Sequence, residues 1–222
     1  MSKLFNIDSK VMRILATVGN LIILNFLWLI ASAPIITIGA STTAMHAVVF
    51  KYAEDSEDAV FKPFFKAFAS SFKQATLLWL PLCAALAILG LDAYYLISHA
   101  ENKINVLLWI PFFIIFAIVA VIATYGFPLI ARFENSLKDI LRNSVLMFLL
   151  NFFASMGILI LNLLPWAMML VVPDIFALTS IFWVMLGGSL IAFFNAKVFL
   201  KIFRKYGNAD EQENTQEILA DR

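Results

Sequence analysis

The chain has 222 residues, of which 62% are hydrophobic and 14% charged, and its mean hydropathy is +0.89. Soluble domains are about half apolar and a quarter charged, so this composition excludes an ordinary water-soluble globule and predicts an integral membrane protein in contact with the lipid bilayer. The net charge is only +1, and no basic block is interleaved with aromatic residues, which argues against nucleic acid as a partner.

The first predicted membrane span is residues 11–33, an apolar run that follows three basic residues near the start of the chain. The run is long enough for a hydrocarbon core that needs about 20 residues. Its end, Ala31, Ser32 and Ala33, has the small-residue pattern of a signal-peptide cleavage site. However, the run exceeds the usual ~7–15 apolar residues of such a peptide, and Pro34 follows directly. We therefore expect the segment to be retained.

The next stretch, residues 35–52, decides the topology. Its 18 residues are moderately hydrophobic and lie at the short end of the range of about 17–25 for a spanning helix. If the stretch spans, the chain crosses six times, and 15 of the 16 lysines and arginines lie on the cytoplasmic side, as the positive-inside rule favours. If it is a loop, the chain crosses five times and the division becomes 12 to 4. We predict six spans, with five as the alternative, and both chain ends in the cytoplasm.

Five phenylalanines and three lysines follow at helical spacing, on different sides of one helix. They are Phe61, Phe64, Phe65, Phe68 and Phe72, with Lys62, Lys66 and Lys73. This pattern predicts a short cytoplasmic amphipathic helix that starts near Pro63. We expect it to lie in the membrane interface with its lysines toward anionic headgroups. The alternative is that the phenylalanine stripe docks onto the helix bundle or onto another protein.

Further spans are predicted at residues 74–98, 106–130, 145–172 and 175–199, with a second short helix at 132–143. Pro165 predicts a kink in the fifth span, and Gly187 and Gly188 predict the close approach of a neighbouring helix to the sixth. Residues 206–222 are acidic and poor in apolar side chains, which predicts a disordered cytoplasmic tail. The predicted fold is thus all-α, a polytopic membrane helix bundle in residues 1–205 followed by a tail in 206–222.

The second predicted span carries the candidate site. At about 100° per residue, Gly39, Thr42, Thr43 and His46 share roughly one third of its surface. The pattern favours a packing seam with a histidine near the cytoplasmic interface, and the alternative is a polar pocket or pathway. Asn25, on the first span, is a candidate for an interhelical hydrogen bond or a ligand contact, because an amide needs a partner in lipid. The same holds for Asn20, Asn151, Asn162 and Asn195.

Nothing in the sequence predicts an enzyme. Two histidines and the single Cys83 provide no metal-ligand spacing, and no nucleophile elbow, zinc-binding helix or phosphate-binding glycine loop is present. We therefore expect no catalytic residues, no metal and no cofactor.

Three motifs carry a resemblance to a known family: residues 33–44 read APIITIGASTTA, residues 64–68 read FFKAF and residues 71–76 read SFKQAT. Together they resemble the YesL-like family of small bacterial integral membrane proteins, over most of the chain up to about residue 205. The family is largely uncharacterised and is commonly encoded near carbohydrate uptake transporters and carbohydrate-degrading enzymes in Gram-positive bacteria.

The resemblance implies a multi-pass protein of the bacterial cytoplasmic membrane, with an accessory or transport-related role in carbohydrate uptake or utilisation. A carbohydrate transporter component or a small saccharide would then be its partner, and no ligand residue can be transferred from the family. The alternative is a membrane scaffold or regulator that binds a transporter subunit or another partner through the Phe/Lys helix.

Overall fold

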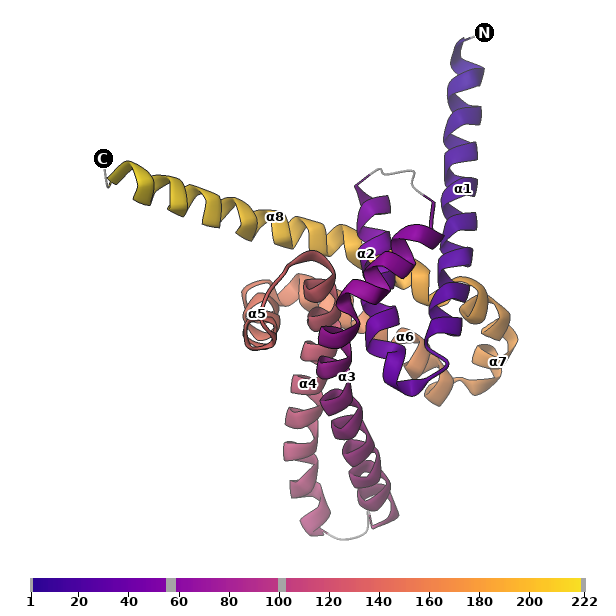
Figure 1. Ribbon diagram of the computed structural model, residues 1–222. Coiled ribbons are helices and arrows are strands. Elements are labelled where there is room, and N and C mark those ends of the chain that lie inside the picture. The colour runs from indigo at the N-terminus through magenta and orange to yellow at the C-terminus, as the bar shows by residue number, and fades with distance from the viewer. Residues whose placement is uncertain (1, 55–58, 100–102, 221–222) are drawn as a thin grey trace.

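The structure is a computed structural model that describes residues 2–54, 59–99 and 103–220, with side chains described for 11–54, 59–99 and 107–205. Every element in these ranges is helical, which confirms the all-α prediction (Figure 1). The elements are α1 (Ser2–Ala31), η1 (Ile35–Thr37), α2 (Ile38–Ala53), α3 (Phe61–Ser98), α4 (Lys103–Arg132), α5 (Leu137–Leu150), α6 (Phe152–Val171), α7 (Pro173–Phe182), the π-helical turn η2 (Trp183–Gly187) and α8 (Gly188–Ala220).

Helix α2 forms the centre of the molecule. It packs against α1, α3, α4 and α8, and ten of its 16 residues are buried. Figure 1 shows that α1 and α2 run in opposite directions, so the start of α1 and the end of α2 lie at the same end of the molecule. The small residues of α2 allow this crowding, because Gly39 and Ala40 leave room for neighbouring backbones.

Five helical segments in the described part of the chain are long and apolar enough to cross a membrane: Val11–Ala31, Phe61–Ser98, Leu107–Arg132, Phe152–Val171 and Pro173–Lys205. Helix α2 is not among them, because it has only 16 residues. However, η1 runs directly into α2, and at 2.0 Å and 1.5 Å rise per residue the two together are about 30 Å long, the thickness of a hydrocarbon core. The combined length of η1 and α2 therefore allows a sixth crossing. The crossing itself stays a prediction.

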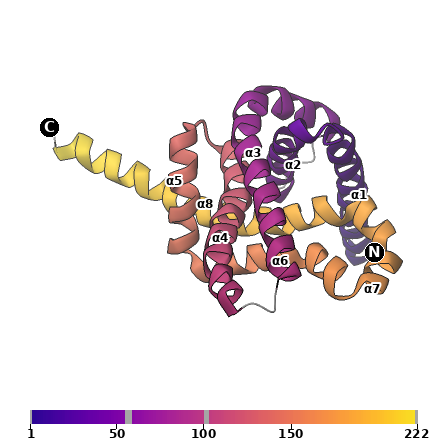
Figure 2. The same cartoon turned by 90° about the horizontal axis from the view of Figure 1, so that it is seen from below.

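The Phe/Lys segment is not a separate helix. It forms the first turns of α3, which has 38 residues and continues into the predicted third span. Pro63 lies in the first turn, where a missing backbone N–H is tolerated, and no helix breaker separates Phe72 from the span. Figures 1 and 2 show that α3 changes direction along its length: its first turns pass over α1 and α2, and its later part lies beside α4.

The fifth predicted span is wrong in its bounds. Residues 145–172 form the end of α5 and all of α6, and the two helices meet at Asn151. The Asn151 side chain donates to the Met147 carbonyl, a local bond that competes with helix continuation. The second short helix does form, but it is longer than expected, because α5 starts after the Ser136 cap and runs to Leu150.

The sixth predicted span lies within one continuous helical segment, Pro173–Lys205, in which the π turn η2 separates α7 from α8. The close approach expected at its glycines is confirmed, because a Cβ on Gly188 would lie 2.9 Å from Asn25 Oδ1 of α1. Figure 2 shows α8 running across the bundle behind α3 and α4. The backbone of α8 continues to Ala220, whereas the side chains of 206–220 lie outside the described residues, so the division of the chain at residue 205 stays a prediction.

Candidate functional site

A cavity of about 390 Å³ opens beside α2, between residues of α1, α4, α6, α7, η2 and α8. Its wall is mostly apolar and includes three tryptophans, Trp28, Trp166 and Trp183. Four hydrogen-bonding side chains also line it: Thr42, His46, Thr124 and Asn162. The volume lies within the range of about 300–1,000 Å³ that small-molecule sites occupy, and an apolar wall with a few polar groups is the usual composition of such sites.

Two of the tryptophans are held in place by threonines. The indole Nε1 of Trp28 donates to Thr42 Oγ1 at 3.1 Å, which ties α1 to α2. The indole Nε1 of Trp183 donates to Thr179 Oγ1 at 3.2 Å, one turn earlier in α7. Because each ring N–H is already bonded, these indoles contribute rigid aromatic surface to the cavity.

His46 lies on the same face of α2, four residues after Thr42. Its side chain is 9% exposed and packs against two rings, with centroids 6.1 Å from Phe50 and 6.3 Å from Phe199. The imidazole Nδ1 is buried and has no hydrogen-bond partner. A buried polar atom without a partner is unusual in a folded protein, so this nitrogen distinguishes His46 from the other polar residues that line the cavity.

Asn162 enters the cavity from α6 and links it to α8. Its Oδ1 accepts a hydrogen bond of 2.7 Å from Asn195 Nδ2, and Asn195 is almost completely buried. This bond fixes the position of the Asn162 amide, because one end of the amide is tied to a neighbouring helix.

The structure divides the four residues predicted on α2 into two pairs. Thr42 and His46 line the cavity. Gly39 instead faces α3, where an added Cβ would lie 2.6 Å from the carbonyl oxygen of Ala75, and Thr43 donates to the Gly39 carbonyl at 2.9 Å. Gly39 and Thr43 thus belong to a packing seam, whereas the role of Thr42 and His46 as ligand-binding residues stays a prediction.

Asn25 bonds to a neighbouring helix rather than lining the cavity. Its Nδ2 donates to the Val184 carbonyl at 2.6 Å, and its Oδ1 accepts from the Ser189 backbone N–H at 3.0 Å. These two backbone groups are five residues apart, which is the spacing of a π-helical hydrogen bond. The Asn25 amide therefore inserts where the helix hydrogen bonding is opened and stabilises the π turn that carries Trp183 into the cavity wall.

The Phe/Lys segment has two faces in the structure. Phe64 is fully buried and Phe68 packs against the core, whereas Phe61, Phe65 and Phe72 are 57%, 51% and 39% exposed. Lys62, Lys66 and Lys73 are all exposed. One side of the segment thus docks onto the bundle, and three phenylalanines with three lysines remain on the surface. We call these six residues the Phe/Lys surface.

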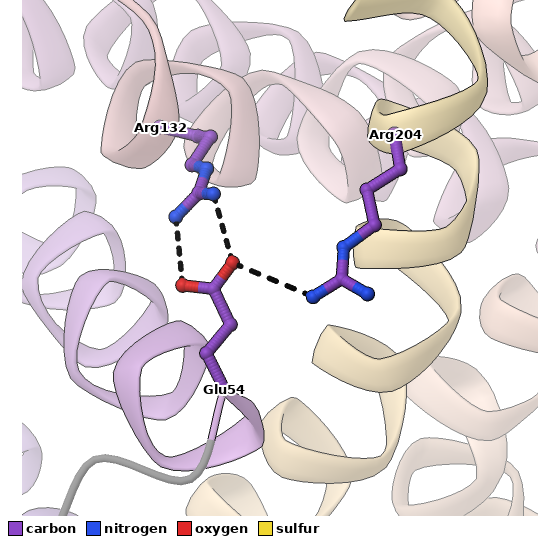
Figure 3. Close-up of polar contacts among 3 residues, drawn as sticks. All are labelled: Glu54, Arg132 and Arg204. Carbon is purple, nitrogen blue, oxygen red and sulfur yellow. Dashed lines mark hydrogen bonds and ion pairs between the residues drawn. The ribbon is translucent and has the colours of Figure 1, made fainter. Parts of the chain in front are cut away.

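An ion-pair cluster joins the ends of α2 and α4 to the middle of α8. Glu54, directly after α2, accepts two hydrogen bonds from Arg132 of α4, at 2.8 and 3.1 Å, and lies 4.0 Å from Arg204 of α8 (Figure 3). The three residues come from segments that the six-span topology places on the cytoplasmic side, so the cluster agrees with that grouping of charges.

Most residues of the cavity wall were not predicted as site residues. Trp28, Trp166, Trp183 and Thr124 carry no periodic pattern that separates them from lipid-facing or core residues. Asn162 was predicted only as an amide that needs a partner. No group of three potential metal ligands occurs among the residues whose side chains the structure describes.

Comparison with known proteins gives two matches. The model of a family described as "Protein of unknown function, DUF624" matches residues 21–93, which include α2 and the Phe/Lys surface. A protein of Bacillus subtilis (strain 168), "Uncharacterized protein YesL", is 26% identical over 200 residues, which cover 88% of this chain and 90% of that protein. No solved structure matches.

Proposed function

We propose that this chain, which is similar to a YesL-like protein over most of its length, is a transport-related or accessory protein of carbohydrate uptake that binds a small saccharide in the cavity beside α2. The role we propose is binding rather than catalysis. The family resemblance suggests the carbohydrate link, and the chemistry of the cavity is compatible with it.

One observation carries the proposal: the convergence of three indoles with four hydrogen-bonding side chains on one cavity. A saccharide ring has an apolar face of C–H groups, which packs on aromatic surface, and a rim of hydroxyls, which need hydrogen-bond partners. The tryptophans supply the first requirement, and Thr42, His46, Thr124 and Asn162 supply the second. These residues come from separate segments of the chain, so only the folded protein has the site.

The test is a binding titration of the purified protein in lipid nanodiscs with a panel of mono- and disaccharides, followed by tryptophan fluorescence. We expect saturable changes in emission with at least one saccharide, because three tryptophans line the cavity. Thr42→Val should weaken that binding, since Thr42 holds Trp28 in place.

Thr43→Val is the matched control, because Thr43 is the adjacent buried threonine and bonds only within its own helix in the described contacts. No response to any saccharide, together with unchanged sugar uptake in a strain that lacks the protein, would remove the proposal.

We also propose that the protein lies in the bacterial cytoplasmic membrane with α2 as a sixth crossing and both chain ends in the cytoplasm. The length of η1 with α2, the opposite directions of α1 and α2, and the Glu54 cluster support this orientation. Reporter tags on the two ends should both report the cytoplasm, and a chain end on the other side would leave five crossings.

The Phe/Lys surface favours a second candidate function, a scaffold or regulator that binds a transporter subunit. Three half-exposed phenylalanines beside three exposed lysines make an amphipathic surface that fits an acidic partner or anionic lipid. Charge reversal of Lys62, Lys66 and Lys73 should abolish co-purification of a carbohydrate transporter subunit and leave membrane insertion intact. Charge reversal of the exposed Lys138 on α5 is the control, and unchanged co-purification of the triple variant would count against this candidate.

A further inference from the structure

No ionic side chain lines the cavity among the residues whose side chains the structure describes. All 16 residues that line it are apolar, aromatic, small or neutral polar, if His46 is taken in its neutral form. A charged ligand in such a site would lose its hydration without gaining a counter-charge, which is costly in a mostly apolar environment. This composition therefore selects against sugar phosphates, uronic acids and amino acids.

His46 Nδ1 gives an independent indication of the ligand. It is buried, it has no hydrogen-bond partner among the described residues, and the His46 residue that carries it lines the cavity. A polar atom that is left unpaired lowers stability, so it usually has a partner that is supplied from elsewhere.

The chemistry of imidazole narrows what that partner is. In a neutral imidazole, Nδ1 is a donor in one tautomer and an acceptor in the other. A hydroxyl can both donate and accept, so it pairs with Nδ1 in either tautomer. An ammonium group can only donate and an ionised carboxylate can only accept, so each suits a single tautomer.

Thr42 places a second constraint on the same wall. It lies one helical turn before His46, and its Oγ1 already accepts the indole N–H of Trp28. Trp28 and His46 therefore line the same cavity, with the indole bonded to α2 one helical turn before the imidazole. A saccharide ring needs both kinds of group, because its C–H face packs on aromatic surface and its hydroxyls need hydrogen-bond partners.

We propose that the ligand of this cavity is an uncharged, hydroxyl-rich solute and that His46 Nδ1 hydrogen-bonds to one of its hydroxyls, which makes His46 a specificity-determining residue. The proposal rests on the proposed function, since it assigns the chemical class of the ligand at the same site.

The experiment compares matched neutral and anionic ligands on the full-length protein in nanodiscs. Each neutral hexose or disaccharide is titrated beside its phosphate and its uronic acid, with binding followed by tryptophan fluorescence and by calorimetry. We expect the neutral member of each pair to bind at least tenfold more tightly, and this comparison needs no variant.

His46→Phe then tests the residue. The substitution keeps a ring in the wall and removes the hydrogen-bonding atom, so the affinity for the neutral ligand should fall by about 2- to 12-fold, the loss that corresponds to one hydrogen bond. His46→Gln keeps a group that can donate and accept, so it should restore part of the affinity. The unliganded His46→Phe protein should unfold at the same or a higher temperature than wild type, because it no longer buries an unpaired nitrogen, whereas a purely structural His46 would give a lower temperature.

His99→Phe is the matched control, because His99 is exposed and follows α3 outside the cavity. If saccharides bind but the anionic member of each pair binds as tightly, or if His46→Phe binds as well as wild type, the inference is wrong while the proposed function stands. If no saccharide binds at all, the proposed function fails and the inference fails with it.

Discussion

Gly39→Ala should destabilise the protein because helix α3 occupies the space that the added methyl group needs. The Cβ would lie 2.6 Å from the Ala75 carbonyl oxygen and 2.6 Å from Trp79 Cβ. Ordinary contact begins at 3.4 Å, so α3 would have to move by about 0.8 Å. Both atoms belong to or adjoin the α3 backbone, so no flexible side chain can absorb the change.

The magnitude follows from two opposing effects. Overpacking a tight contact costs typically about 1–3 kcal/mol, and two such contacts place this site near the upper end. Replacement of a helical glycine by alanine returns up to about 1 kcal/mol through helix propensity. The net expectation is a loss of about 2 kcal/mol of the free energy of unfolding.

The assay is reversible unfolding in mixed detergent, followed by circular dichroism. Gly157→Ala on α6 is the control, because nothing lies within 4 Å of its added Cβ, so the same substitution should be neutral or stabilising there. Equal stability of the two variants would contradict the packing of α2 against α3 on which the position of the cavity depends.

Three further predictions use the same assay. Asn25→Ala should lower the free energy of unfolding by about 1–3 kcal/mol, because two backbone groups of the π turn lose their partner, whereas Asn20→Ala on the same helix should change it by less than about 0.5 kcal/mol. Tyr125→Phe should cost about 1 kcal/mol, since it removes the buried hydroxyl bond to α6, and Tyr94→Phe on the exposed end of α3 should cost nothing measurable. Glu54→Gln should cost less than about 1 kcal/mol and less still at high salt, because the ion pair is partly exposed.

Each of these has a clear contrary outcome. An Asn25→Ala protein as stable as wild type would show that the π turn does not need the amide. A loss at Tyr94 equal to that at Tyr125 would contradict the burial assigned to the two rings. A loss above about 2 kcal/mol at Glu54 that salt does not reduce would mean that the cluster is buried.

The all-helical class and most helix positions could be predicted, because long apolar runs in so hydrophobic a chain are explained by membrane-spanning helices. Helix breaks were harder to predict. The division at Asn151 and the π turn at Trp183 depend on local side-chain bonds and on the insertion of Asn25 from α1, and neither leaves a periodic signal in the sequence.

The candidate site was predicted in part, for a geometrical reason. Around the α2 axis the order of the predicted residues is Thr42, His46, Gly39 and Thr43, across about 100°. A sector of that width can face two neighbours at once. In the structure Thr42 and His46 face the cavity, Gly39 faces α3, and Thr43 is buried with a hydrogen bond inside its own helix. The tryptophans, Thr124 and Asn162 come from other segments, and periodicity within one helix cannot show which helices meet.

The claim on which the account depends is that the cavity beside α2 admits water and a saccharide, and cysteine labelling tests it most directly. In a Cys83→Ser background, Ala123→Cys places a thiol in the cavity wall, and Ala120→Cys places one on the same helix outside the wall. We predict that a small water-soluble thiol reagent modifies Ala123→Cys and that a saturating neutral saccharide slows this reaction, with no effect of the saccharide at position 120. The account would be contradicted if the thiol at position 123 did not react, or if no saccharide slowed its reaction relative to the rate without saccharide.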